Sequence, residues 1–217
     1  MRVWETYLEG CFVIEPKIFE DDRGAFFESF NEEVFEKKTG LIVNFVQDNQ
    51  SVSQRGVIRG LHMQKGEFAQ AKLVRVVKGK VLDVAVDVRK ESKTFGDHFS
   101  IELSSENNTQ LFVPKGFLHG FATLENNTIV VYKCDNYYNV EAESGVLYND
   151  PELKIDWVLV AEEIIVSEKD KKLSLLQKVS FKKLLDAIFT DKVWIFLISF
   201  ALIGLIAFLF NDKIKAR

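Results

Sequence analysis

The stretch KVLDVAVDVR (residues 80–89) decides the class of fold, because its hydrophobic side chains recur at a period of two. This period is typical of a β-strand, in which successive side chains point to opposite faces. Asp83 and Asp87 fall on the same face, so that face is not a plain hydrophobic core. The stretch AKLVRVVKG (71–79) comes directly before it and ends in Lys-Gly, a turn signal that separates two strands.

More short strands are expected outward from this pair. Asn-rich turn signals at 106–108 and 126–127 separate them, and the predicted strands are 98–103, 109–114, 120–125 and 128–134, with a further strand entering GVIRGLHMQ (56–64). One helix is expected over 31–40, with Asn31 as N-cap and Gly40 as the C-terminal stop. Many short strands at near-regular spacing predict a mainly β fold, a β-sandwich or barrel.

The composition points to one domain with an appendage, since the chain has 217 residues and 47% hydrophobic content. The formal net charge is −4, but the first 178 residues hold 22 basic and 29 acidic residues. This acidic body argues against binding of nucleic acid. The two cysteines form no CxxC motif, and the N-terminus has no apolar run, so we expect neither a disulfide framework nor a signal peptide.

The C-terminal region differs from the rest of the chain. Residues 193–210 are 18 consecutive uncharged residues, long enough as a helix for roughly 27 Å, and they predict a transmembrane helix with basic flanks. The body is then residues 1–178, followed by an amphipathic linker helix (179–192) and, after the span, a short basic tail (211–217). The basic flanks favour a membrane-anchored protein with its body on the cytoplasmic side.

Two alternatives stay open for this region. The hydrophobic segment could be a buried core helix, although such helices are rarely apolar all round. The linker helix could lie on the membrane surface or pack on the body.

The histidines could in principle bind a metal ion. His119 lies in VPKGFLHGF (113–121), whose Pro-x-Gly-x-x-His spacing resembles the second metal motif of cupins. The first cupin motif would need His-x-His followed by Glu, but here the residues are His62, Met63 and Gln64. Two histidines without a matched third ligand make a weak metal site, so no metal is predicted.

Acid–base chemistry is the stronger candidate. A histidine is a good general base near neutral pH, and it needs an orienting carboxylate, a partner acid and a cation that stabilises negative charge on the substrate. His62 is the candidate base, and either Asp83 or Asp170 could orient it. Tyr132 is the candidate acid, and the candidate cations are Lys72 and Arg59.

Several segments, in order, resemble one family, the nucleotide-sugar epimerases typified by dTDP-4-dehydrorhamnose 3,5-epimerase. The resemblance covers about residues 3–178 and is carried by FEDDRGAFFESF (19–30), FVQDNQSVS (45–53), GVIRGLHMQ (56–64), AQAKLVRVVKGKVLDVAVDVRKESKTFG (69–96), LFVPKGFLHGF (111–121), YKCDNYYNVEAESG (132–145) and VSEKD (166–170). It implies a cupin-like jelly roll that epimerises C3 and C5 of dTDP-4-keto-6-deoxyglucose, in rhamnose-type deoxysugar biosynthesis for surface polysaccharide. It implies no cofactor.

The resemblance also assigns roles to single residues. His62 would remove the proton α to the C4 ketone and Tyr132 would return one from the opposite face. Asp170 would orient His62, with Asp83 as the alternative, and Lys72 would stabilise the enolate oxygen. The substrate-binding positions would be Arg23 and Arg59 at the diphosphate, Tyr138 against the thymine, Glu28, Gln47 and Asn49 at the base and sugar, and His119, Glu143 and Lys169 as further contacts.

The resemblance suggests a homodimer in which Arg23 or its strand reaches across to the partner. The departures from the family pattern are Met63, Phe68 and Tyr148, where an aromatic residue, a proline and a tryptophan are usual, together with the hydrophobic tail. They remove no catalytic group but leave the exact hexose open. The alternatives are a C3-only or C5-only epimerase, a related sugar ketoisomerase, and a non-catalytic nucleotide-sugar binding module on the membrane.

Overall fold

The computed structural model describes residues 1–176, and residues 1–175 form one compact unit. The predicted linker helix (179–192), transmembrane helix (193–210) and basic tail (211–217) lie outside the described residues. Among residues 1–176 no helix combines the length and the hydropathy needed to cross a bilayer.

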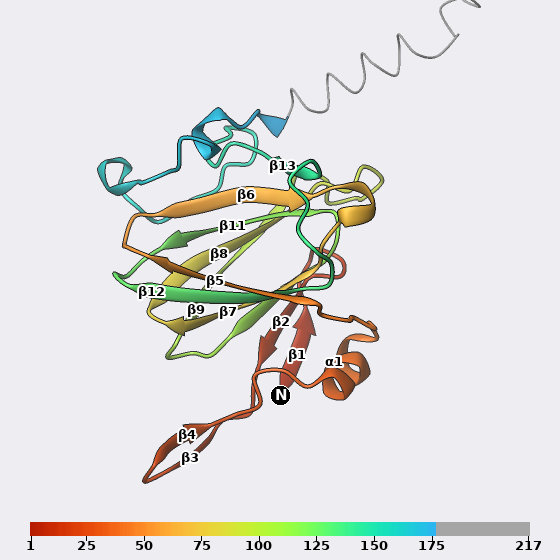
Figure 1. The fold of residues 1–217 in the computed structure, drawn as a ribbon, viewed down its shortest axis with the longest axis vertical. Coiled ribbons are helices and arrows are strands. Elements are labelled where there is room, and N and C mark those ends of the chain that lie inside the picture. Colours follow the sequence, from red (N-terminus) through yellow and green to blue (C-terminus); the bar gives the residue numbers. More distant parts are fainter. Residues whose placement is uncertain (177–217) are drawn as a thin grey trace, which may run out of the picture. The chain divides into compact units, whose positions relative to one another are not determined.

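Two large antiparallel sheets form most of the unit, as predicted for a mainly β, double-sheet fold, and a separate two-stranded hairpin adds a third, small sheet (Figure 1). The six-stranded sheet has the order β1 (Arg2–Glu5), β2 (Phe12–Glu15), β10 (Gln110–Val113), β7 (Lys72–Lys78), β12 (Thr128–Cys134), β5 (Gln47–Ser53). The five-stranded sheet has the order β13 (Glu143–Gly145), β6 (Ile58–Gln64), β11 (Phe117–Thr123), β8 (Lys80–Asp87), β9 (His98–Ser104). Except for the pairs β1–β2 and β8–β9, neighbours in these two sheets are not consecutive in sequence, so pairing between remote segments builds most of the fold.

The strand predictions hold with small shifts. The strand predicted at 128–134 is β12, and the stretches 71–79 and 80–89 are β7 and β8. The strand predicted at 120–125 is wrong by three residues at its start, because Gly116, at φ +83°, ends the preceding turn and β11 begins at Phe117. β1, β2, β5 and β13 were not predicted from the sequence, nor was the hairpin of β3 (Phe19–Asp21) and β4 (Gly24–Phe26).

The predicted helix is α1 (Glu32–Thr39), and both of its caps are as expected. The side chain of Asn31 accepts a hydrogen bond from the Val34 N–H, which satisfies one of the free donors of the first turn. Gly40 adopts φ +73° and donates its N–H to the Glu36 carbonyl, a left-handed C-terminal cap. The other helices are short 3-10 turns, η1 (Gly66–Phe68), η2 (Ala161–Glu163) and η3 (Asp170–Lys172).

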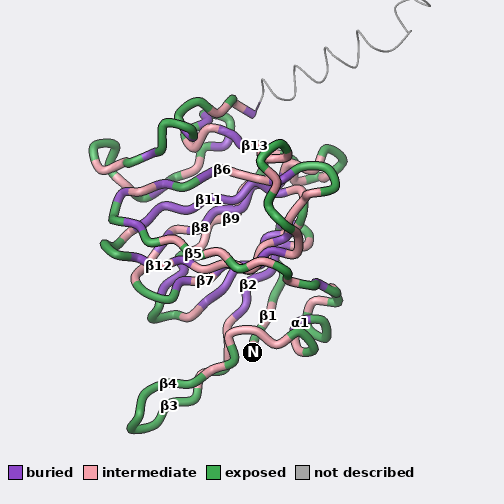
Figure 2. The backbone as a smooth tube through the Cα atoms, in the orientation of Figure 1, coloured by how far each residue is buried: buried purple, intermediate pink, exposed green. Residues whose placement is uncertain are grey.

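The main hydrophobic core lies between the sheets. It includes Val74 and Val130 from the six-stranded sheet and Val81, Ala85 and Phe121 from the five-stranded sheet. Val84 and Val86, on the other face of β8, are also fully buried. Figure 2 shows buried backbone along β11 and β8 and an exposed β3–β4 hairpin. Since β8 is buried on both faces, its two aspartates need partners inside the protein.

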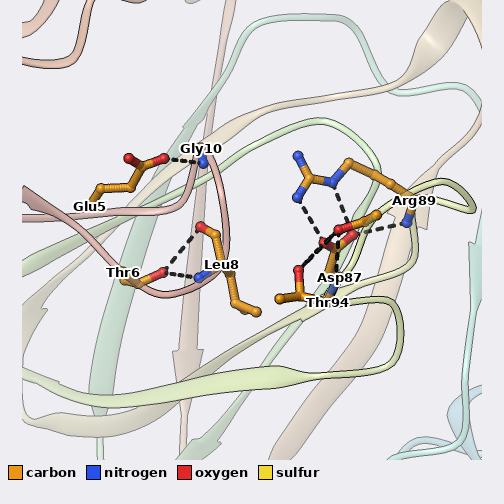
Figure 3. Close-up of polar contacts among 8 residues, drawn as sticks. Glu5, Thr6, Leu8, Gly10, Asp87, Arg89 and Thr94 are labelled. Carbon is orange, nitrogen blue, oxygen red and sulfur yellow. Dashed lines mark hydrogen bonds and ion pairs between the residues drawn. The ribbon is translucent and has the colours of Figure 1, made fainter.

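Asp87 has such partners at the end of β8. Its carboxylate accepts hydrogen bonds from the Arg89 guanidinium at 3.0 and 2.7 Å, and from the hydroxyls of Ser92 and Thr94 at 2.6 and 2.8 Å (Figure 3). Burial acts to raise the pKa of Asp87, but the hydrogen bonds outweigh it and lower the pKa to about 2. This network fixes the turn after β8, and it explains why a carboxylate is tolerated at a fully buried position.

We expect Asp87→Asn to lower the free energy of unfolding by about 2–3 kcal/mol at pH 7, because the Arg89 guanidinium loses its buried counter-charge. The folded-state pKa is depressed, so the wild-type contribution is present above pH 3.8 and is lost as the pH falls through about 2. Urea unfolding at pH 7 and at about pH 3 should therefore show a larger difference between wild type and variant at pH 7. Asp97→Asn, at a nearby exposed position, is the control and should change stability by less than about 0.5 kcal/mol. Equal losses for the two variants would contradict the assignment.

Candidate active site

A cleft of about 580 Å³ opens between the two sheets and holds eight of the predicted site residues. It is bounded by β5, β7 and β12 from the six-stranded sheet, by β6 and β11 from the five-stranded sheet, and by the segment 165–170. The predicted residues that line it are His62, Tyr132, Asp170, Lys72, Asn49, Arg59, His119 and Lys169. Side chains from both sheets therefore face the same space.

His62, on β6, is paired with Asp170. Its Nε2 lies 2.7 Å from Asp170 Oδ1, with the imidazole 29% exposed and the carboxylate 6% exposed. Asp170 begins η3, and its N–H donates to the Ser167 hydroxyl at 3.0 Å. A buried carboxylate held in this way fixes the tautomer and orientation of the imidazole. Of the two carboxylates left open by the sequence, Asp170 is the one beside His62.

Asp83 belongs to a second pair, so the alternative that placed it beside His62 is wrong. Its Oδ1 lies 2.8 Å from His119 Nε2, and both side chains are buried. The cause is strand register, because β8 pairs with β11 and sets Asp83 opposite Phe121, close to His119. His119 is in turn directly opposite His62 on β6. The cleft thus has two adjacent histidines, each with its own aspartate.

Tyr132 and Lys72 come from the facing sheet, on neighbouring strands. The Lys72 ammonium lies 5.8 Å from the centre of the Tyr132 ring. The centre of the His119 ring lies 6.4 Å from the centre of the same Tyr132 ring. Burial raises the pKa of the Tyr132 phenol, Cys134 adds to this and Arg59 opposes it, so the phenol stays protonated at neutral pH. Burial also lowers the pKa of the Lys72 ammonium, which Cys134, Asp83 and Glu143 only partly offset. The six-stranded sheet therefore offers a proton donor and a desolvated ammonium group.

Arg59 lines the cleft and is held by Ser53, a residue that was not predicted from the sequence. Arg59 Nε donates to the buried Ser53 hydroxyl at 3.1 Å. Ser53 shares the inward face of β5 with Gln47, Asn49 and Ser51, as the more buried residues of QDNQSVS alternate along the strand. Because the inward residues of β5 are all polar and Val52 is exposed, no hydrophobic period marks this strand, and the sequence carries no signal that predicts either serine. The guanidinium is exposed enough to meet an oxyanion.

The remaining predicted contacts form a hydrogen-bonded rim. The Tyr138 N–H donates to Gln47 Oε1 at 3.0 Å, Gln47 Nε2 donates to Asn49 Oδ1 at 3.0 Å, and Asn49 Nδ2 lies 3.6 Å from Cys134 Sγ. Glu143 Oε2 accepts from the Tyr138 hydroxyl at 2.7 Å and from Lys169 Nζ at 2.5 Å. These amide and carboxylate groups are held in defined orientations before any ligand binds.

Arg23 and Glu28 are not brought to the cleft of their own chain. Arg23 lies in the turn of the β3–β4 hairpin, where its guanidinium is paired with Asp21 at 2.5 Å and is 90% exposed. Glu28 accepts a hydrogen bond from Asn31 at 3.2 Å, at the start of α1. The hairpin projects away from the two sheets (Figure 1), so the expectation that these two residues join the others is not met within one chain.

Residues 1–176 contain no group of three or more His, Cys, Asp or Glu side chains placed to hold a metal ion. The chemistry available in the cleft is that of a histidine–aspartate base, a phenolic acid and a cation, arranged around a space of about 580 Å³.

Comparison with known proteins gives consistent matches. The family model described as dTDP-4-dehydrorhamnose 3,5-epimerase matches residues 5–178. The dTDP-4-dehydrorhamnose 3,5-epimerase of Methanothermobacter thermautotrophicus is 49% identical over 171 residues, covering 78% of this chain and 91% of that protein. The crystal structure of the Elizabethkingia anophelis protein of the same name is 50% identical, with a TM-score of 0.79, over 82% of this chain and 97% of that one. The Legionella pneumophila dTDP-6-deoxy-D-glucose-3,5-epimerase, solved with dTDP-4-keto-L-rhamnose, is 46% identical, with a TM-score of 0.78, over 81% of this chain and 93% of that one.

Proposed function

This chain belongs to the dTDP-4-dehydrorhamnose 3,5-epimerase family, and from that premise we propose how its cleft residues divide the work of the reaction. The chain is an isomerase that epimerises C3 and C5 of dTDP-4-keto-6-deoxyglucose to give dTDP-4-keto-rhamnose in dTDP-rhamnose biosynthesis. The paired antiparallel sheets support its placement among the cupin-like jelly rolls. We propose that the product is used in the synthesis of surface polysaccharide.

One observation carries the mechanism, namely that the candidate base and acid stand on opposite sheets. His62 comes from β6 and Tyr132 from β12, and both line the cleft between them. A sugar ring bound in that space presents one face to each. Inversion at a carbon needs a proton removed from one face and a proton delivered to the other, and this arrangement provides both.

The first step is removal of the proton α to the C4 ketone. His62 Nε2 faces Asp170, so the ring nitrogen left to accept the substrate proton is Nδ1. Asp170 then stabilises the imidazolium that forms. The electron pair of the broken C–H bond moves to the C4 oxygen, which becomes an enolate.

Lys72 stabilises that enolate. It is desolvated, and it lies beside Tyr132 on the acid side of the cleft, where a cation is worth more than in water. Since C3 and C5 both adjoin the C4 ketone, one cation serves both half-reactions. Tyr132 then donates its phenolic proton to the carbon from the opposite face, and the enolate collapses to the C4 ketone. The phenolate recovers a proton from solvent, and the His62 imidazolium releases its proton to solvent, which regenerates both groups.

The nucleotide occupies the outer part of the cleft. Arg59, oriented by Ser53, suits the diphosphate because a guanidinium matches oxyanion geometry. Tyr138, half-exposed at the rim, offers a ring for the thymine, and Gln47 and Asn49 offer amides for the base and sugar. The remaining contacts are His119, Glu143 and Lys169.

We propose that the chain works as a homodimer in which Arg23 and Glu28 reach the partner's cleft. The β3–β4 hairpin is exposed on both strands, and its paired residues Phe19 and Phe26 are 53% and 70% exposed. An isolated two-stranded hairpin is at best marginally stable in water, so it favours a partner surface. Sedimentation of the chain should give twice its mass of 24.9 kDa, and a fully active monomer would contradict the dimer.

We also propose that residues 193–210 anchor the enzyme in the membrane with its body on the cytoplasmic side. The support is the 18-residue uncharged run and its basic flanks. Fractionation of cells should place the full-length chain with the membranes until detergent is added. Recovery in the supernatant without detergent would contradict the anchor.

The direct test of the reaction is NMR of the full-length chain with dTDP-4-keto-6-deoxyglucose in D₂O. Deuterium is expected to enter both C3 and C5, because each proton is lost to His62 and replaced from solvent through Tyr132. Label at only one carbon would indicate a C3-only or C5-only epimerase. No label, with the nucleotide sugar still bound, would indicate a binding module.

A further inference from the structure

The carboxylate of Glu143 joins two separate segments at the cleft mouth. The same oxygen, Oε2, accepts from the Tyr138 hydroxyl at 2.7 Å and from the Lys169 ammonium at 2.5 Å. The Glu143 side chain is only 16% exposed. Burial acts to raise its pKa, but the hydrogen bonds from Lys169 and Tyr138 outweigh this, so the pKa of Glu143 is lowered and the group is a carboxylate. Glu143 is therefore a charged side chain that connects Tyr138 to Lys169.

The first of the two segments carries Tyr138, whose ring is the proposed platform for the nucleobase. Tyr138 is held by its N–H to Gln47, and the next residue, Asn139, donates its N–H to the buried side chain of Gln64 at 3.0 Å. The backbone of this loop is therefore fixed, while the Tyr138 ring stays 52% exposed. The hydroxyl contact with Glu143 sets the direction of the ring.

The second segment carries Asp170. Lys169 comes directly before it, and the Lys169 carbonyl accepts the Lys172 N–H at 3.1 Å in the η3 turn. Holding the Lys169 side chain thus holds the turn that presents Asp170 to His62. Packing is close here, since a Cβ at Gly145 would lie 2.9 Å from a Leu173 methyl.

Strand register brings Glu143 close to the general base, His62. β13 pairs with β6, which sets Gly145 opposite His62 and Glu143 opposite Gln64. Glu143 is therefore two residues before Gly145, which lies opposite His62. The link spans from the nucleobase platform to the histidine–aspartate pair along one edge strand.

We propose that Glu143 is a positioning residue that couples occupation of the Tyr138 platform by the nucleobase to the placement of Asp170 against His62. This inference rests on the proposed function. Binding energy from the non-reacting thymidine is then used to orient the general base, His62. This raises kcat as well as the affinity for the substrate. Glu143 acts through its two partners and touches no reacting atom.

The test compares two substrates at saturation, dTDP-4-keto-6-deoxyglucose and the same sugar 1-diphosphate without thymidine. For the wild-type enzyme, kcat should be about tenfold or more higher with the nucleotide substrate. In Glu143→Gln, which keeps the shape but loses the charge, the ratio of the two kcat values should fall toward one. Lys169→Met breaks the link from its exposed end and should give the same loss of ratio.

Glu168→Gln is the matched control, because Glu168 is exposed and pairs with Lys171 instead. It should keep the wild-type ratio. A wild-type ratio in Glu143→Gln, with KM raised equally for both substrates, would overturn the coupling while leaving the epimerase assignment intact. A wild-type enzyme that turns over neither substrate would overturn the proposed function and the coupling with it.

Discussion

Replacing His62 with alanine is expected to lower kcat by about 10²–10⁴-fold while leaving the fold intact. The imidazole is the group that takes the α proton. His119 does not replace it, because the His119 side chain is only 6% exposed whereas that of His62 is 29% exposed to the cleft. His62 is only partly buried, so its removal leaves no large cavity. Two NMR measurements in D₂O test this expectation. One is steady-state turnover, and the other is the incorporation of deuterium at C3 and C5, which should fall in the variant.

His98→Asn is the matched control for this variant. His98 lies on β9, the outer strand of the five-stranded sheet, and β11 and β8 separate it from β6. It should therefore keep near-normal turnover, although it removes one of the three histidines. A His62→Ala enzyme with thermal unfolding like wild type and near-normal turnover would exclude His62 as the base.

Replacing Tyr132 with phenylalanine is expected to separate the two halves of the reaction. His62 can still remove and exchange the α proton, but no phenol is left to donate from the opposite sheet. Inversion should fall by about 10²–10⁴-fold, while deuterium from D₂O continues to enter the substrate with its configuration retained. The ring keeps its place beside Lys72 and His119, so the cleft should stay formed.

Tyr137→Phe serves as the control, because it removes a hydroxyl from a side chain that is 63% exposed. It should invert C3 and C5 at close to the wild-type rate. Inverted product formed at that rate by Tyr132→Phe would mean that another group donates the proton. Loss of both inversion and exchange would mean that Tyr132 is needed for deprotonation, and the proposed division of roles would be wrong.

Local patterns in the sequence predicted most of the strands and the helix. The period of two in residues 80–89 became β8, and Asn31 and Gly40 became the caps of α1. These features depend on neighbours within a few residues, which is why they can be recognised without a structure. The missed strands are short or polar, as in QDNQSVS of β5, so their hydrophobic alternation is weak.

The members of the candidate site were predicted from the sequence, but not all of their pairings were. The resemblance placed His62, Tyr132, Lys72 and Asp170 together, and the cleft holds all four. Residue types alone left Asp83 and Asp170 as equal candidates to orient His62. They are separated only by strand register and by the path of the chain after β13.

The sequence by itself determined the class of fold, the helix caps and the set of chemically able side chains, because each depends on local periodicity or residue type. Only the tertiary structure decided which aspartate serves which histidine, since the partners of His62 and His119 lie 108 and 36 residues away. It also decided that base and acid stand on opposite sheets, and that Arg23 lies away from its own cleft. Such contacts depend on the pairing of distant strands, which buries the whole core at once and is not encoded in any single segment.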